Sequence, residues 1–215
     1  RPSMTKRPAI ALLAIVAIAL ALRLAWVAHA DFAPTLNDDA GRYDAIARSL
    51  ADGGGFVNPN GATTMFWPPG YPFILAAVYK TWPGALLGEH ELTVALALHA
   101  VLGAATVALA YAVGRRAFGA TAAMLGAAIL ALFPSMIFLA GVTLTETTFT
   151  FLLMLALWLI VEAEARGSVR LLALAGAVIG CAALVRGQAV LLPLAAIPFW
   201  LLSAGTTRLG VRSAL

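Results

Sequence analysis

Charged residues are scarce in this chain of 215 residues, since only 11% are Asp, Glu, Lys or Arg. About a quarter of an average soluble domain is charged, and disordered chains have low hydrophobicity. Because 62% of the residues are hydrophobic, the composition excludes both a disordered segment and a soluble domain of this size. One cysteine, Cys181, excludes a disulfide-stabilised scaffold. These absences leave a membrane protein that crosses the bilayer several times.

Long apolar runs are abundant, and a bilayer core of about 30 Å needs roughly 20 helical residues. They predict an all-α, polytopic transmembrane protein with about six spans, forming a single module over residues 1–215. The first span covers 8–30, an extracytoplasmic loop covers 31–91, and spans two to six lie within 92–204. The later spans are predicted at 92–113, 118–139, 145–161, 171–185 and 189–204. The last two are short and flank Arg186, so four spans with a re-entrant pair is the alternative.

The basic residues predict the orientation of the chain in the membrane. If the N-terminus is cytoplasmic, nine of the fourteen basic residues lie on the inner side, in agreement with the positive-inside rule. Seven of the ten acidic residues lie in the 31–91 loop, which then faces away from the cytoplasm. We therefore expect an integral protein of the cell or inner membrane, with the lipid bilayer as a partner. The net charge of +4 reflects this distribution, and we expect no nucleic-acid partner.

The extracytoplasmic loop is predicted to contain two short interfacial helices. The first begins with Asn37 as its N-cap and ends at the glycines of residues 53–55. Its predicted features are an apolar face of Ala40, Tyr43, Ala47 and Leu50 and the i,i+4 pairs Asp38–Arg42 and Asp44–Arg48. The second covers 71–82, which is too short to cross a bilayer and is flanked by Trp and Tyr side chains. These features alone describe a capped surface helix on the membrane, with no chemistry.

The residues of this loop also resemble a known family. The stretches DDAGRYDAIARSLADGGGF (38–56) and WPPGYPFILA (67–76) resemble the first extracytoplasmic loop of polyprenyl-phosphate-sugar-dependent glycosyltransferases. This membrane-embedded GT-C class includes the dolichyl-phosphate-mannose protein mannosyltransferases and the bacterial lipid A aminoarabinose transferase. The family pattern has an acidic residue four positions before a tyrosine, where Asp39 stands relative to Tyr43. Its second acid usually follows the first, whereas Asp38 precedes it here, so either aspartate is a candidate.

The resemblance implies an all-helical enzyme that transfers a sugar from a polyprenyl-phosphate donor to an extracytoplasmic acceptor, with inversion. The acceptor would be a glycan, a lipid or a protein hydroxyl. The implied general base is Asp39, with Asp38 as second choice, and the implied phosphate ligands are Arg186 and Arg42. The substrate-binding set is Arg186, Glu146, Tyr43 and Arg42, and a divalent cation (Mg or Mn) would be held by Asp39 and Glu146. Family members are longer, so we expect a fragment or a truncated member.

Several of these polar residues also have purely structural explanations. Glu146 and Thr143 have the spacing of a capping box at a helix start. Arg186 is expected either to contact a phosphate or to snorkel to the interface, because a central arginine is costly in lipid. Arg23 is expected to snorkel or to pair with Asp31 or a phosphate. The three histidines lack the spacing of a zinc site.

Two alternatives to the enzyme follow from the same sequence. A transporter or flippase subunit would explain the broken pair around Arg186, and a non-catalytic fragment would bind lipid phosphate without turnover. The Ala28-His29-Ala30 pattern would also suit a cleaved signal segment. The positions of the polar side chains in the structure distinguish the enzyme from these alternatives. We expect an enzyme to bring the loop aspartate, Glu146 and Arg186 into one cavity.

Overall fold

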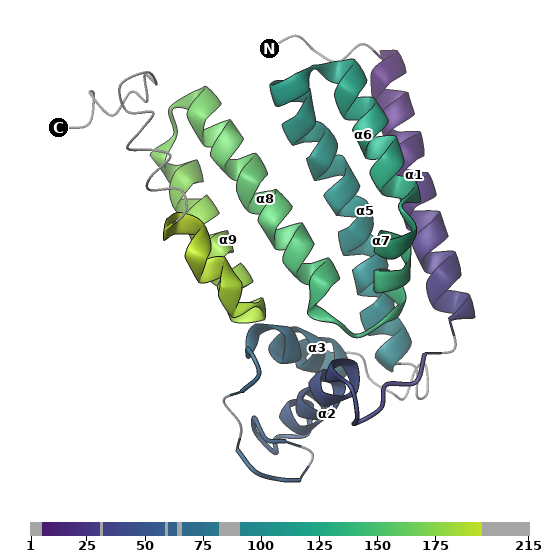
Figure 1. The fold of residues 1–215 in the computed structure, drawn as a ribbon, viewed down its shortest axis with the longest axis vertical. Coiled ribbons are helices and arrows are strands. Elements are labelled where there is room, and N and C mark those ends of the chain that lie inside the picture. The colour runs from purple at the N-terminus through teal and green to yellow at the C-terminus, as the bar shows by residue number, and fades with distance from the viewer. Residues whose placement is uncertain (1–5, 31, 59, 64–65, 82–90, 195–215) are drawn as a thin grey trace, which may run out of the picture.

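The computed structural model describes residues 6–30, 32–58, 60–63, 66–81 and 91–194, and these fold almost entirely into helices (Figure 1). The helices are α1 (Lys6–His29), α2 (Asp39–Ala51), α3 (Gly70–Thr81), α5 (Glu91–Phe118), α6 (Ala120–Leu132), α7 (Pro134–Phe138), α8 (Thr145–Arg166) and α9 (Val169–Val185). Two short 3-10 helices, η1 (Leu139–Gly141) and η2 (Gly187–Val190), join the later elements. The all-α prediction is confirmed.

Within the described ranges, three helices are long and apolar enough to cross a membrane. They are Pro8–His29, Glu91–Phe118 and Thr145–Arg166, and the broken segment that follows α5 is a fourth if it is counted as one span. The expected count of six spans is therefore not confirmed. Helix α9 is apolar but has only 17 residues, and most of the predicted span 189–204 lies outside the described residues.

The long helices run side by side, with α5 in contact with α1, α6 and α8, while α9 packs on α8 (Figure 1). Helices α2 and α3 lie together across one end of this bundle, opposite the end where α1 begins. Small side chains at the contacts of α1, α5 and α6 include the buried Ala19, Ala104 and Ala127. Small residues let helix backbones approach closely, which is how helices associate in lipid.

The third predicted span, 118–139, is wrong as a single straight helix. The chain bends by 54° between α6 and the segment Pro134–Gly141. Pro134 has no N–H to bond the carbonyl of Leu130, and the residue before a proline is disfavoured in the helical conformation. Phe133 accordingly has extended dihedral angles, φ −68° and ψ 116°. The break exposes the last carbonyl groups of α6.

Arg23 binds these carbonyl groups, so the snorkelling expectation for this residue is wrong. Its side chain is buried, with 1% of its surface exposed. One guanidinium nitrogen donates to the carbonyl of Ala131 at 3.1 Å and to that of Ala19 at 2.9 Å, and the other donates to Leu130 at 3.4 Å. Gly103 provides the space, because a Cβ there would lie 2.7 Å from the Arg23 Nε. Asp31, its other proposed partner, lies outside the described residues.

Helix α2 packs on protein through its apolar face. Tyr43 and Ala47 are buried against Tyr71 and Leu75 of α3, and the cluster continues to α5 and α9 through Ala95 and Val185. The predicted face is thus present, but this burial differs from a helix that rests on the membrane surface. The helix predicted at 71–82 appears as α3 and is likewise buried on this side, so interfacial helices are not confirmed.

Candidate functional site

A cavity of about 300 Å³ lies where the start of α2, the start of α8 and the break after α9 meet. It contains four of the six predicted site residues, namely Asp39, Tyr43, Glu146 and Arg186. The other two, Asp38 and Arg42, do not line it. The remaining lining residues are Pro68, Leu144, Thr145, Gly187 and Gln188. The structure therefore brings a loop aspartate, Glu146 and Arg186 together, which is the arrangement expected of an enzyme.

The two adjacent aspartates have different surroundings. Asp38 is the N-cap of α2, and its carboxylate accepts the Gly41 N–H at 2.8 Å and the Thr35 hydroxyl at 2.9 Å. These bonds, that of the Gly41 amide first, lower the pKa of Asp38. The N-cap prediction of Asn37 is wrong by one residue. Because the capping bonds favour its charged form and commit its oxygens, Asp38 serves the fold of α2.

Asp39 is the first residue of α2 and is exposed. Among the described residues, no hydrogen bond or ion pair involves its carboxylate. Its side chain lines the cavity, so its oxygens are free to accept a proton or a hydrogen bond from a ligand. The structure thus separates the two candidates, and it is Asp39 that faces the cavity.

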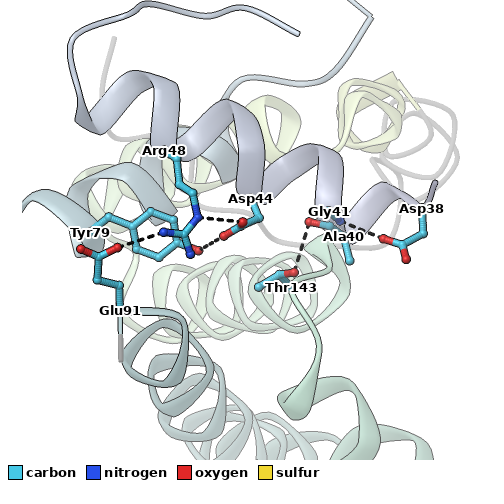
Figure 2. A network of polar contacts seen from close by, with 8 residues as sticks. All are labelled: Asp38, Ala40, Gly41, Asp44, Arg48, Tyr79, Glu91 and Thr143. Atoms are coloured by element: carbon cyan, nitrogen blue, oxygen red, sulfur yellow. Dashed lines mark hydrogen bonds and ion pairs between the residues drawn. The ribbon is translucent and has the colours of Figure 1, made fainter. Parts of the chain in front are cut away.

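The start of α8 differs from the predicted capping box. The N-cap is Leu144, with no side-chain cap bond, and Thr143 lies one residue before it. The buried Thr143 hydroxyl donates instead to the carbonyl of Ala40 at 3.2 Å. This bond joins the segment before α8 to the first turn of α2 (Figure 2). Glu146 is therefore not engaged in capping.

Glu146 forms an ion pair across the cavity wall. Its Oε1 lies 3.0 Å from Nη1 of Arg186, and the two side chains are 35% and 32% exposed. Arg186 occupies the break between α9 and η2, where its backbone is extended. The predicted break at this residue is confirmed. The guanidinium also lies over the ring of Phe149, 5.7 Å from the ring centroid, which adds a cation–π contact.

Tyr43 forms the buried side of the cavity. Its ring makes edge contacts with Trp67 at 5.2 Å and Tyr71 at 5.3 Å between centroids. Burial raises the pKa of the Tyr43 hydroxyl, and the charge of Asp39 raises it further. The group is thus a neutral hydrogen-bond donor at physiological pH. Arg42 lies outside the cavity, 5.8 Å from the centroid of the Trp67 ring, so no Asp38–Arg42 pair forms in the described region.

A polar network holds α2 in place beside the site (Figure 2). Asp44 accepts a hydrogen bond from the Tyr79 hydroxyl at 2.6 Å and pairs with Arg48 at 2.9 Å, which confirms the predicted Asp44–Arg48 pair. Arg48 also pairs with Glu91 at the start of α5, at 3.2 Å. Burial first, and then the adjacent Asp44, raises the pKa of Tyr79. The network joins α2, α3 and α5, so that the first turn of α2 has a fixed position.

Gln188 is the clearest polar lining residue that the sequence analysis did not single out. It follows Arg186 by two positions in an otherwise apolar stretch, and this isolated amide was the available signal. Pro68, Leu144 and Thr145 carry no such signal, because their contribution depends on how the segments meet.

The cavity does not have the ligands of a complete metal site. In the described part of the chain, no group of three or more His, Cys, Asp or Glu side chains is placed to hold a cation. Asp39 and Glu146 share the cavity, but Glu146 is already paired with Arg186, and Mg²⁺ or Mn²⁺ prefers several oxygen ligands. We therefore derive no chemical step through a divalent cation, and the cation at Asp39 and Glu146 stays a prediction.

These features define a class of protein: an all-helical membrane protein whose polar cavity is built from a loop aspartate and an arginine at a helix break. These features agree with the membrane-embedded glycosyltransferases of the GT-C type, and a match to a family model supports that class. The chain belongs to the dolichyl-phosphate-mannose-protein mannosyltransferase family, whose sequence profile matches residues 54–214. Glu146, Arg186 and Gln188 lie within the matched region, whereas Asp39 and Tyr43 precede it. No curated protein and no solved structure gave a significant match.

Proposed function

We propose that this protein transfers a sugar from a polyprenyl-phosphate donor to an acceptor hydroxyl on the extracytoplasmic side of the membrane. The observation that carries the proposal is the shared cavity of Asp39 and Arg186. A free carboxylate and a guanidinium are the two groups that this reaction requires, one for the acceptor proton and one for the departing phosphate. The family implies glycosyl transfer in general, and the donor and the roles below are our proposals.

Asp39 is the proposed general base. Its carboxylate takes the proton of the acceptor hydroxyl as that oxygen attacks the anomeric carbon of the sugar. Asp39 has no competing partner among the described residues and lies beside the neutral Tyr43 hydroxyl, which is available to donate a hydrogen bond to the substrate. A single attack from the face opposite the phosphate inverts the configuration at the anomeric carbon.

Arg186 is the proposed ligand of the donor phosphate. As the new glycosidic bond forms, the bond from the anomeric carbon to the phosphate oxygen breaks, and its electron pair leaves with the phosphate. The planar guanidinium offers parallel donors to two phosphate oxygens. The Phe149 ring beneath it supports this orientation. Because the leaving group is already an anion, no strong general acid is required.

The position of the cavity supports a lipid-linked donor. The cavity lies at the end of the bundle where α2 and α3 sit, and we propose that this end faces away from the cytoplasm. A polyprenyl chain can then remain in the bilayer while its phosphate reaches Arg186. The polar residues that line the cavity lie at this end and include Asp39, which favours a transferase over the transporter or flippase alternative.

The proposal is tested by turnover of the full protein in nanodiscs with a polyprenyl-phosphate sugar and an acceptor hydroxyl. We expect transfer with inversion, read from the anomeric configuration of the product by NMR. Arg186→Gln is expected to raise the donor KM and to lower kcat by about 10²-fold or more, since it removes a group that stabilises developing charge. Arg166→Gln, in the last turn of α8 and outside the cavity, is the matched control. Retention of configuration, or unchanged kinetics in Arg186→Gln, would contradict the proposal.

A further inference from the structure

The charges of the cavity do not favour an anionic ligand in the arrangement observed. Its lining includes two carboxylates, Asp39 and Glu146, and a single guanidinium, Arg186, so its formal charge is −1. Tyr43 and Gln188 are neutral. The donor proposed above carries a negative phosphodiester, which would enter a cavity of its own sign. One of the two carboxylate side chains must therefore move away before the phosphate can bind Arg186.

Glu146 is the carboxylate that pairs with Arg186, the arginine proposed to bind the phosphate. Its Oε1 lies 3.0 Å from Arg186 Nη1 in an ion pair, and a phosphate oxygen would form an ion pair with the same guanidinium. Both side chains are about one-third exposed, so the pair is accessible to a ligand and is not sealed in the protein. Exposed pairs of this kind are weak and exchange readily.

Each partner retains other contacts when the pair separates. Arg186 stays over the Phe149 ring, so the guanidinium remains oriented toward the cavity. Glu146 is also within 3.4 Å of the Thr145 hydroxyl through its second oxygen, Oε2. The exchange thus requires a change in the Glu146 side chain, and α8 and α9 keep their positions.

We infer that Glu146 is an exchangeable counter-ion, which holds Arg186 in the empty site and is displaced by the phosphate of the lipid donor. This inference rests on the proposed function, because it concerns the same arginine and the same ligand. After transfer, the return of Glu146 to Arg186 competes with the lipid-phosphate product and promotes its release. Glu146 thereby lowers the affinity of the site for the lipid phosphate and increases the rate of turnover.

The test compares binding of two probes to the full protein in nanodiscs: farnesyl phosphate, which is anionic, and farnesol, which has the same chain and no charge. Glu146→Gln is expected to bind farnesyl phosphate about two- to fivefold more tightly than the wild type, as expected from loss of an exposed ion pair. Its affinity for farnesol is expected to be unchanged. Glu146→Asp should restore wild-type binding of the phosphate. Glu164→Gln, which neutralises an exposed carboxylate near the end of α8 and outside the cavity, is the matched control and should leave both affinities unchanged.

The outcomes separate this inference from the proposed function. Equal or weaker binding of farnesyl phosphate by Glu146→Gln overturns the exchange, while a loss of binding in Arg186→Gln still supports the phosphate site. If Arg186→Gln binds the phosphate as well as the wild type does, the donor site itself is wrong. Thermal unfolding of each variant shows that it is folded. Farnesol binding is measured in the same samples, because a general structural defect would change it as well.

Discussion

Two neighbouring aspartates show how much depends on single residues. Sequence alone could not assign roles to Asp38 and Asp39, because the assignment depends on which residue starts the helix. Asp38 immediately precedes α2, so its carboxylate caps the helix and accepts the Gly41 N–H. Asp39, the next residue, lines the cavity with its carboxylate. The same limit applies to Glu146, where a helix start one residue later than predicted removed the capping box.

The cap role of Asp38 predicts a dependence of stability on pH. Its folded-state pKa is lowered below 3.8, first by the hydrogen bond from the Gly41 amide. The stabilisation is therefore fully present above this unfolded value and is lost as the pH falls through the folded value. Asp38→Ala is expected to lower the free energy of unfolding by about 1 kcal/mol at neutral pH.

The check is thermal unfolding of detergent-solubilised protein at pH 7 and at pH 3. Asp38→Asn is the matched variant, because an amide oxygen also caps a helix but does not titrate over this range. We expect Asp38→Asn to unfold as the wild type does at pH 7, with less loss on acidification. An Asp38→Ala variant as stable as the wild type at pH 7 would show that the cap contributes nothing.

Among the elements, the long helices were predictable and the broken one was not. Helices α1, α5 and α8 were expected from the apolar runs 8–30, 92–113 and 145–161, because about 20 apolar helical residues span a bilayer. The structure extends the last of these runs to Arg166. The run 118–139 is equally apolar, so its hydropathy gave no sign of a bend. Pro134 was the missed signal, since it removes one helical hydrogen bond. The partner that compensates for this loss, Arg23, lies in another helix and could be assigned only from the structure.

The contact between Arg23 and the broken helix predicts a measurable coupling. Arg23→Met leaves the carbonyls of Leu130 and Ala131 without their charged donor in the wild-type background, and we expect it to destabilise the protein by about 2 kcal/mol. In a Pro134→Ala background, the new Ala N–H can bond the Leu130 carbonyl, so Arg23→Met should cost about 1 kcal/mol less. The measurement is a double-mutant cycle of unfolding in mixed detergent micelles. Strictly additive effects would contradict the assigned contact.

For the whole molecule, the uneven distribution of charge now corresponds to the two ends of the bundle. Glu162 pairs with Arg116 and Arg166 at the end where α8 finishes, and the acidic 31–91 segment includes α2 and α3 at the opposite end. Sequence counting could anticipate this separation because charge in membrane proteins follows the sides of the bilayer. It could not locate the cavity, which requires segments about a hundred residues apart to meet.

The orientation is tested by cysteine labelling in intact cells with a membrane-impermeant maleimide. In a Cys181→Ala background, we expect Asn60→Cys, in the turn beyond α2, to be labelled without lysis. Ala165→Cys, near the end of α8, should be labelled only after the membrane is opened. Both native side chains are exposed, so access to the reagent differs only through the membrane. The reverse pattern would place the cavity on the cytoplasmic side.

The most direct test of the account compares turnover of Asp39→Asn and Asp38→Asn with a polyprenyl-phosphate sugar donor. Removal of a general base typically lowers the rate by about 10²–10⁴-fold. We therefore predict a loss of kcat within this range for Asp39→Asn, whereas Asp38→Asn, which retains a cap, keeps most of its activity. Wild-type turnover in a folded Asp39→Asn variant, or a selective loss in Asp38→Asn, would contradict the assignment of Asp39 as the base.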